Sequence, residues 1–148
     1  MARPTKYNYQ VFNLFKESNE FSNEKQFGDF IEKSLPYIFS KTLKLNIKSM
    51  QREAKFGNGV GVIKQRVDFL CILQDGKRIG IECKRHFAPF RQQIDSIGQC
   101  LYYKSIFKLD EIYVISPCFH PSFIELIKAY DLPIKIGILN KTYSAWIL

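Results

Sequence analysis

Two apolar segments decide the fold of this chain: RVDFLCIL at residues 66–73 and IGIECK at residues 79–84. Each has the length and the β-branched content of a β-strand. Only residues 74–78 (QDGKR) separate them, so we predict an antiparallel hairpin. Each segment also carries one carboxylate, Asp68 or Glu82, among apolar neighbours. Burying an ionised carboxylate is costly unless it is paired or binds a cation, so both residues demand an explanation.

The length of the hairpin loop decides whether the two carboxylates can meet. Residues directly opposite on antiparallel strands share a face of the sheet, and a shift of one residue reverses that relation. A two-residue turn at 75–76 would place Asp68 and Glu82 on opposite faces. A three-residue loop at 74–76 places them opposite each other, and this loop type favours a left-handed residue at its third position, where Gly76 stands. We therefore predict the three-residue loop, with Gly76 at positive φ and the carboxylates converging.

The first clear helix begins after Asn23, a plausible N-cap with Gln26 three residues further on. One apolar stripe follows at helical spacing, made of Phe27, Ile31, Leu35 and Ile38. Pro36 is expected to kink or end this helix early, because proline lacks the backbone N–H that a helix interior needs.

The remaining segments alternate between strand and helix patterns. A second helix is predicted to bury Phe90, Ile94, Ile97 and Leu101, and to leave Gln92, Ser96, Gln99 and Tyr103 on the opposite, polar stripe. The expected strands are 43–55, 62–73, 78–84, 111–116, 134–139 and 143–148, and the later helices are 89–107 and 121–130. The order α-β-β-β-α-β-α-β-β predicts an α/β fold, a mixed sheet flanked by helices.

The composition is that of one globular domain of 148 residues, with 46% hydrophobic residues and no apolar run near the ~20 residues that would span a bilayer. We expect an N-terminal arm (1–20), a core (23–116) and a C-terminal extension (117–148). The start of the chain lacks the apolar stretch of a secretory signal. Four scattered cysteines without a CxxC pair favour reduced thiols, so a cytoplasmic protein without a membrane partner is expected.

The net charge of +8 favours a polyanionic partner, because Lys and Arg that neutralise phosphates release condensed counterions. This charge permits a nucleic-acid function and does not establish one. The glycine-rich segment 56–61 does not have the spacing of a phosphate-binding loop, so we interpret it as a connection between strands.

The spacing of Asp68, thirteen residues and then Glu82-x-Lys84 resembles the motif of the PD-(D/E)XK nuclease superfamily, although Val67 stands where that motif has proline. The expected α-β-β-β-α-β order is similar to the core of that superfamily over about two thirds of the chain. Two further elements resemble motifs of some members: Gly28-x-x-x-Glu32 in the first helix and Gln99-x-x-x-Tyr103 in the second.

The resemblance implies a magnesium-dependent DNA nuclease with a restriction-endonuclease-like αβββαβ core. It implies that Asp68, Glu82 and the backbone carbonyl of Cys83 bind Mg²⁺, with Mn²⁺ as a substitute. Such an ion lowers the pKa of a bound water and neutralises charge on phosphoryl oxygens. Lys84 would then orient the attacking water or stabilise the transition state, and Glu32 would serve as a further catalytic carboxylate.

For the remaining candidate residues, the sequence supports only less specific functional roles. Gln99 and Tyr103 are possible accessory residues, although a solvated helix face has the same pattern. Three residues that follow the catalytic strand closely would contact nucleic acid, or belong to a generic basic surface: Arg85, His86 and Arg91.

Each proposed site residue also has an ordinary structural explanation. Glu82 and Lys84 would pair on a solvated strand face, a contact worth at most ~1 kcal/mol. Asp68 would pair with Arg66, and Glu32 would be an exposed helix residue. Glu53 is a possible extra acid, with a solvated charge at a strand end as the alternative.

The functional hypothesis from sequence is a structure-selective DNA endonuclease of the junction-resolvase or restriction type. It is expected to act as a homodimer, because two DNA strands need two active sites. A DNA-binding module that keeps the fold without turnover, and a nuclease that acts on RNA, remain the alternatives.

Overall fold

A single six-stranded sheet forms the centre of the protein, and its strands lie in the order in which the chain runs through them. The computed structural model describes residues 7–15, 21–56, 65–84, 90–141 and 144–147. Neighbours pair antiparallel from β1 to β3 and between β5 and β6, and parallel from β3 to β5. The strands are β1 (Ile47–Phe56), β2 (Gln65–Leu73), β3 (Arg78–Cys83), β4 (Glu111–Ser116), β5 (Lys135–Leu139) and β6 (Ser144–Ile147).

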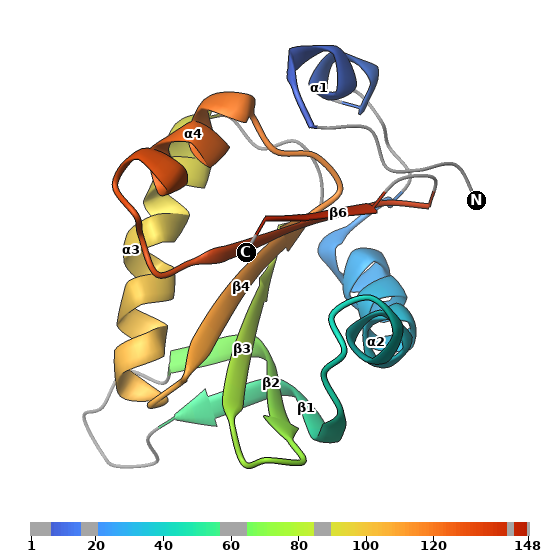
Figure 1. Ribbon diagram of the computed structural model, residues 1–148, viewed down its shortest axis with the longest axis vertical. Helices are drawn as coiled ribbons and strands as arrows, with labels where there is room; N and C mark the ends of the chain where they lie inside the picture. The colour runs from blue at the N-terminus through green and yellow to red at the C-terminus, as the bar shows by residue number, and fades with distance from the viewer. Residues whose placement is uncertain (1–6, 16–20, 57–64, 85–89, 142–143, 148) are drawn as a thin grey trace.

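Helices cover both faces of this sheet (Figure 1). Helix α2 (Glu24–Lys41) packs on one face, and α3 (Phe90–Ile106) and α4 (Pro121–Ala129) pack on the other. A short helix, α1 (Tyr9–Phe15), lies against the start of α4, where Phe12 approaches the ring of His120 at 5.0 Å between centroids. The α/β class and the mixed sheet flanked by helices are confirmed.

The start of α2 follows the capping prediction, whereas its length does not. The Asn23 side chain accepts from the N–H of Gln26 at 2.8 Å, and Gln26 accepts in return from Ser22 N. The prediction that Pro36 kinks or ends the helix early is wrong for its end, because α2 continues to Lys41. Pro36 lies on the exposed side, and the buried stripe continues past it to Phe39, so packing holds the helix together beyond the proline.

The predicted apolar stripe of α3 packs against the core but is not its most buried face. The residues buried against the sheet are Gln93, Ser96, Cys100 and Tyr103, whereas Ile94, Ile97 and Leu101 are only half-buried. Buried polar groups are tolerated where they are hydrogen-bonded. The Ser96 hydroxyl donates to Gln93 O at 2.6 Å, and the Gln93 side chain accepts from His120 N at 3.0 Å.

The other boundaries differ little from expectation. Strand β1 begins at Ile47, four residues later than predicted. The glycine-rich segment 57–61 and the first part of the predicted strand 62–73 lie outside the described residues. All four cysteines are free, in agreement with reduced thiols. Among the helices of the described segments, none has the length and apolar character needed to cross a membrane.

Candidate active site

The β2–β3 hairpin has the predicted loop. Leu73 N donates to Lys77 O at 2.9 Å and closes a loop of three residues, 74–76. Gly76 lies at φ +90°, in the left-handed region that the third position of this loop requires. The predicted three-residue loop and the positive φ of Gly76 are confirmed. The last backbone pair is Phe69 with Ile81, and Asp68 and Glu82 are the next residues along the two strands.

The backbone pairing of the hairpin ends next to the two carboxylates. The last paired residues are Phe69 and Ile81. Beyond them, Asp68 N donates to Glu82 Oε1 at 3.2 Å, and Cys83 N donates to Asp68 Oδ2 at 2.8 Å. Each carboxylate therefore accepts a hydrogen bond from the main chain of the opposite strand, and this exchange fixes the position of both.

The neighbouring strand β1 is irregular at the same level. Glu53, which falls opposite Asp68 in the β1–β2 register, has φ +55°, a conformation that costs a residue with a Cβ about 1 kcal/mol or more. In β2 itself, Val67 packs in the core beneath α3, whereas Phe69 packs in the core beneath α2. Alternate residues of a regular strand share a face, so β2 departs from regular geometry around Asp68.

Burial makes the carboxylate pair electrostatically unfavourable. Glu82 is only 4% exposed, and this burial, reinforced by the charge of Asp68, raises the pKa of Glu82 from its ordinary value of 4.5 to about 8. The pKa of Asp68 is raised as well, mainly by burial, although the hydrogen bond from Cys83 N opposes this rise. The positive charge of Lys84 lowers both pKa values but does not compensate for burial. The negative charge of the two carboxylates is therefore not fully compensated by nearby positive charge.

Lys84 lies at the end of β3, next to the pair. Its N–H donates to Ile115 O at 2.8 Å, which continues the pairing of β3 with β4 by one residue. Its side chain is half-buried. The fold therefore brings Asp68, Glu82 and Lys84 close together.

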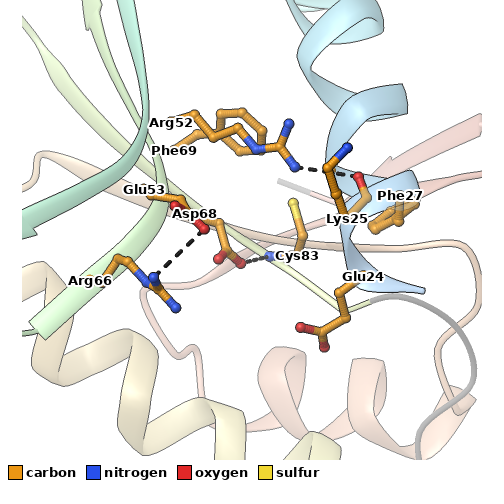
Figure 2. Close-up of a pocket in the computed structure, with 10 residues that line it drawn as sticks. Glu24, Lys25, Phe27, Arg52, Glu53, Arg66, Asp68, Phe69 and Cys83 are labelled. Carbon is orange, nitrogen blue, oxygen red and sulfur yellow. Dashed lines mark hydrogen bonds and ion pairs between the residues drawn. The ribbon is translucent and has the colours of Figure 1, made fainter.

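A cavity of about 370 Å³ opens beside Asp68, between the start of α2 and strands β1 to β3 (Figure 2). Glu82 is buried and does not line it. The wall carries carboxylates, basic groups and apolar surface: Glu24, Lys25, Phe27, Gly28, Arg52, Glu53, Arg66, Asp68, Phe69 and Cys83. A cavity lined by both carboxylates and basic groups suits an anionic group that approaches together with a cation.

The structure does not place Glu32 at this cavity. Its carboxylate accepts from Arg52 Nη1 at 2.8 Å, and its side chain is 48% exposed. Glu24, two turns earlier in α2, lines the cavity instead, and its negative charge raises the pKa of both Asp68 and Glu82. Sequence reasoning missed Glu24 because an acid in the first turn of a helix is already explained by the helix dipole.

The predicted accessory residues lie on the α3 side of the pair. Gln99 Nε2 donates to the Tyr103 hydroxyl at 2.9 Å. Tyr103 is buried, which raises its pKa, and the charges of Glu82 and Asp68 act in the same direction. Arg91 is exposed on α3, whereas Arg85 and His86 lie outside the described residues.

The described segments contain no group of three or more His, Cys, Asp or Glu side chains placed to bind a metal ion by themselves. Two carboxylates are nevertheless a sufficient protein contribution for Mg²⁺, which keeps several waters and commonly uses one or two carboxylates together with substrate phosphates. The oxygen donors and the uncompensated negative charge of the pair fit such an ion.

Comparison with known proteins supports the fold. No protein-family model matches the sequence, and no curated protein matches it. Among solved structures, protein VC1899 from Vibrio cholerae aligns with 80% of this chain at a TM-score of 0.58 and 14% identity. A repair endonuclease from Pyrococcus abyssi aligns with 76% at 0.49 and 15% identity, and the EndoMS-dsDNA2 complex with 70% at 0.41 and 18% identity.

The aligned region spans less than half of each of these chains: 31% of the Vibrio protein, 45% of the Pyrococcus endonuclease and 42% of the EndoMS chain. At these identities the likeness concerns the arrangement of helices and strands. The site residues of this chain are therefore interpreted from their own geometry.

Proposed function

We propose that this chain is a nuclease that hydrolyses DNA phosphodiester bonds with the help of a divalent cation, Mg²⁺ or in its place Mn²⁺. The observation that carries the proposal is the buried Asp68–Glu82 pair, held by reciprocal main-chain hydrogen bonds and lacking positive charge. A fold that holds two carboxyl groups this close together, one of them buried, resists charging both, and a hard cation offsets that cost directly.

The ligands of the cation would be the carboxylates of Asp68 and Glu82 and the backbone carbonyl of Cys83, with Glu24 approaching from α2. When bound, such an ion lowers the pKa of water and neutralises charge on phosphoryl oxygens. The two main-chain hydrogen bonds hold the carboxylates in place before any ion arrives.

The basic residues would act on the substrate. Lys84, half-buried beside the pair, has the position to stabilise negative charge that develops on the reacting phosphate, where low solvent exposure strengthens its effect. Lys25 and Arg66, with side chains 80% and 54% exposed, lie at the cavity and would contact neighbouring phosphates. The net charge of +8 supports binding to a polyanion.

The finer parts of the proposal concern the substrate and the assembly. We propose a structure-selective endonuclease of the junction-resolvase or restriction type, in the PD-(D/E)XK superfamily, that acts as a homodimer in the cytoplasm. Two sites related by a two-fold axis would cut the two strands of a duplex. A DNA-binding module without turnover is the main alternative. It is disfavoured because Asp68, Glu82 and Lys84 are all present and close together.

The direct test is a cleavage assay with supercoiled, linear, single-stranded and four-way-junction DNA and with RNA, each with Mg²⁺ and with EDTA. We expect cation-dependent cleavage of DNA by the wild-type protein. Asp68→Ala should abolish cleavage and leave DNA binding largely intact, because binding rests on the basic surface. Glu125→Gln on the exposed side of α4 is the control for loss of one negative charge. Undiminished cleavage by Asp68→Ala would refute the proposed site.

A further inference from the structure

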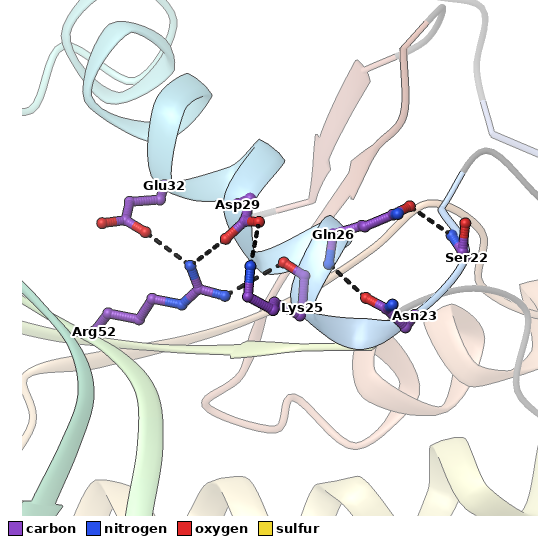
Figure 3. A network of polar contacts seen from close by, with 7 residues as sticks. All are labelled: Ser22, Asn23, Lys25, Gln26, Asp29, Glu32 and Arg52. Atoms are coloured by element: carbon purple, nitrogen blue, oxygen red, sulfur yellow. Dashed lines mark hydrogen bonds and ion pairs between the residues drawn. The ribbon is translucent and has the colours of Figure 1, made fainter.

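The first turns of α2 are tied to the sheet by one side chain, Arg52 of β1 (Figure 3). Arg52 Nη1 donates to Asp29 at 2.6 Å and to Glu32 at 2.8 Å, and Nη2 donates to the carbonyl of Lys25 at 3.3 Å. The guanidinium carbon lies 5.7 Å from the centroid of the Phe69 ring. Three acceptors within two turns of one helix, with an aromatic ring alongside, fix the helix relative to strands β1 and β2.

Gly28 makes this close approach possible. A Cβ at position 28 would lie 2.4 Å from Arg52 Nη2 and 3.1 Å from Cζ, so any larger residue would displace the guanidinium. Glycine lowers helix propensity by about 1 kcal/mol, so its presence in the interior of α2 indicates a need for space. Gly28 and Glu24 are four residues apart, on the same side of the helix, and both line the cavity.

The contacts of Arg52 have a geometric rather than an energetic role. Asp29 and Glu32 are 42% and 48% exposed, and ion pairs with exposed partners add little to stability. The planar fork of arginine, however, gives several hydrogen bonds in a fixed arrangement, which an ammonium group cannot reproduce. Removal of Arg52 should therefore change where the start of α2 lies more than whether the protein folds.

We infer that Arg52, admitted by Gly28, is a positioning residue that holds Glu24 across the cavity from Asp68 and so sets the affinity of the site for a divalent cation. Glu24 immediately precedes Lys25, whose carbonyl Arg52 binds, and it stands in the first turn, where helices fray. This inference rests on the proposed function, because it assumes that Asp68 and Glu82 receive the cation.

The test is calorimetric titration with Mn²⁺ alone, without DNA. Arg52→Gln should weaken Mn²⁺ binding roughly tenfold, the lower end of the range for residues that orient metal ligands. Arg52→Lys should lose nearly as much, because lysine keeps the charge and loses the fork. Lys48→Gln, an exposed lysine on the same strand, is the matched control and should bind as the wild type does.

Two further variants separate positioning from misfolding. Gly28→Ala retains every charged group and should weaken Mn²⁺ binding in the same way as Arg52→Gln, which keeps the inference testable if Arg52→Gln does not fold. Glu24→Gln should weaken binding by itself, and adding Arg52→Gln to it should cause no further loss, because Arg52 acts through Glu24. In cleavage assays the Arg52 variant should need more cation and recover its rate at saturation.

The outcomes distinguish this inference from the proposed function. Wild-type Mn²⁺ affinity in Arg52→Gln or Gly28→Ala, or fully additive losses in the double variant, would overturn the positioning role. If the wild-type protein binds no Mn²⁺, or if Asp68→Asn binds it equally well, the proposed cation site itself fails. Loss of Mn²⁺ binding in Asp68→Asn, together with no further loss when Arg52→Gln is added to Glu24→Gln, supports both the cation site and the positioning role of Arg52.

Discussion

Replacement of Glu82 by glutamine should stabilise the cation-free protein at neutral pH, although it removes a residue that we place in the active site. Glutamine has nearly the same size as glutamate and keeps an oxygen that can accept from Asp68 N. The substitution removes the cost of either keeping this carboxyl group protonated or burying its charge beside Asp68. It tests whether the pair is held at the expense of stability, as the proposed function requires.

The magnitude and sign follow from the pKa of Glu82, which rises from 4.5 to about 8 on folding. Below pH 4.5 the carboxyl group is protonated in both states and has no effect. Between these values the unfolded chain releases its proton first, so stability falls as the pH rises, and the loss is complete above pH 8. At about 1.4 kcal/mol per tenfold change in proton affinity, the loss reaches at most about 5 kcal/mol.

The assay is urea unfolding of the wild type, Glu82→Gln and the control Glu125→Gln in EDTA, from pH 4 to pH 9. The stability difference between Glu82→Gln and the wild type should grow across this range and become constant above pH 8. Added Mg²⁺ should narrow the difference by stabilising the wild type, because a ligand that binds only the folded state stabilises it.

Two results would refute this reasoning. A difference between Glu82→Gln and the wild type that does not change with pH would show that Glu82 is not buried as an unfavourable charge. A variant less stable than the wild type at pH 8 in EDTA would show that the carboxylate has a compensating partner within the protein.

Three other predictions concern the basic residues. Lys84→Ala should lower turnover by orders of magnitude and keep Mg²⁺ binding, because the ammonium acts on the transition state; a loss of calorimetric Mg²⁺ affinity would contradict this role. Arg66→Ala should weaken DNA binding and reduce the salt slope of binding by about 1. Glu53→Gln should tighten DNA binding, because it removes the carboxylate that lies 3.7 Å from Arg66. Equal affinities of the two variants for DNA would argue against Arg66 as a phosphate contact. DNA affinity of the wild type should fall steeply with salt, and a flat response would point away from a nucleic-acid partner.

The hairpin could be predicted from sequence because its determinants are local. The loop length and the need for positive φ at Gly76 together fix which residues of β2 and β3 face each other. The same is true of the Asn23 cap, whose hydrogen bond reaches only three residues along the chain. In both cases the residues that decide the structure are close in sequence.

The errors arose where distant segments decide. The burial of Gln93 and Ser96 depends on hydrogen bonds, one of them with His120 on another element, and apolar periodicity within α3 does not contain this information. The positions of Glu24 at the cavity and of Glu32 away from it also depend on a distant residue, Arg52 of β1, which binds Glu32. The sequence signal for this contact is a glycine inside the helix, Gly28, together with an arginine in a neighbouring strand, Arg52.

The arrangement of strands in chain order also affects how the molecule folds. Strands β1 to β3 pair antiparallel in chain order, whereas β4 and β5 each pair only after a crossover helix, α3 or α4, has formed. The hairpin can thus form while Asp68 and Glu82 are still in water. Glu82 loses its solvent only when β4 pairs with β3 and the domain packs around it, whereas Asp68 stays at the cavity. We expect the carboxylate pair to slow that late docking step and to leave the rate of hairpin formation unchanged.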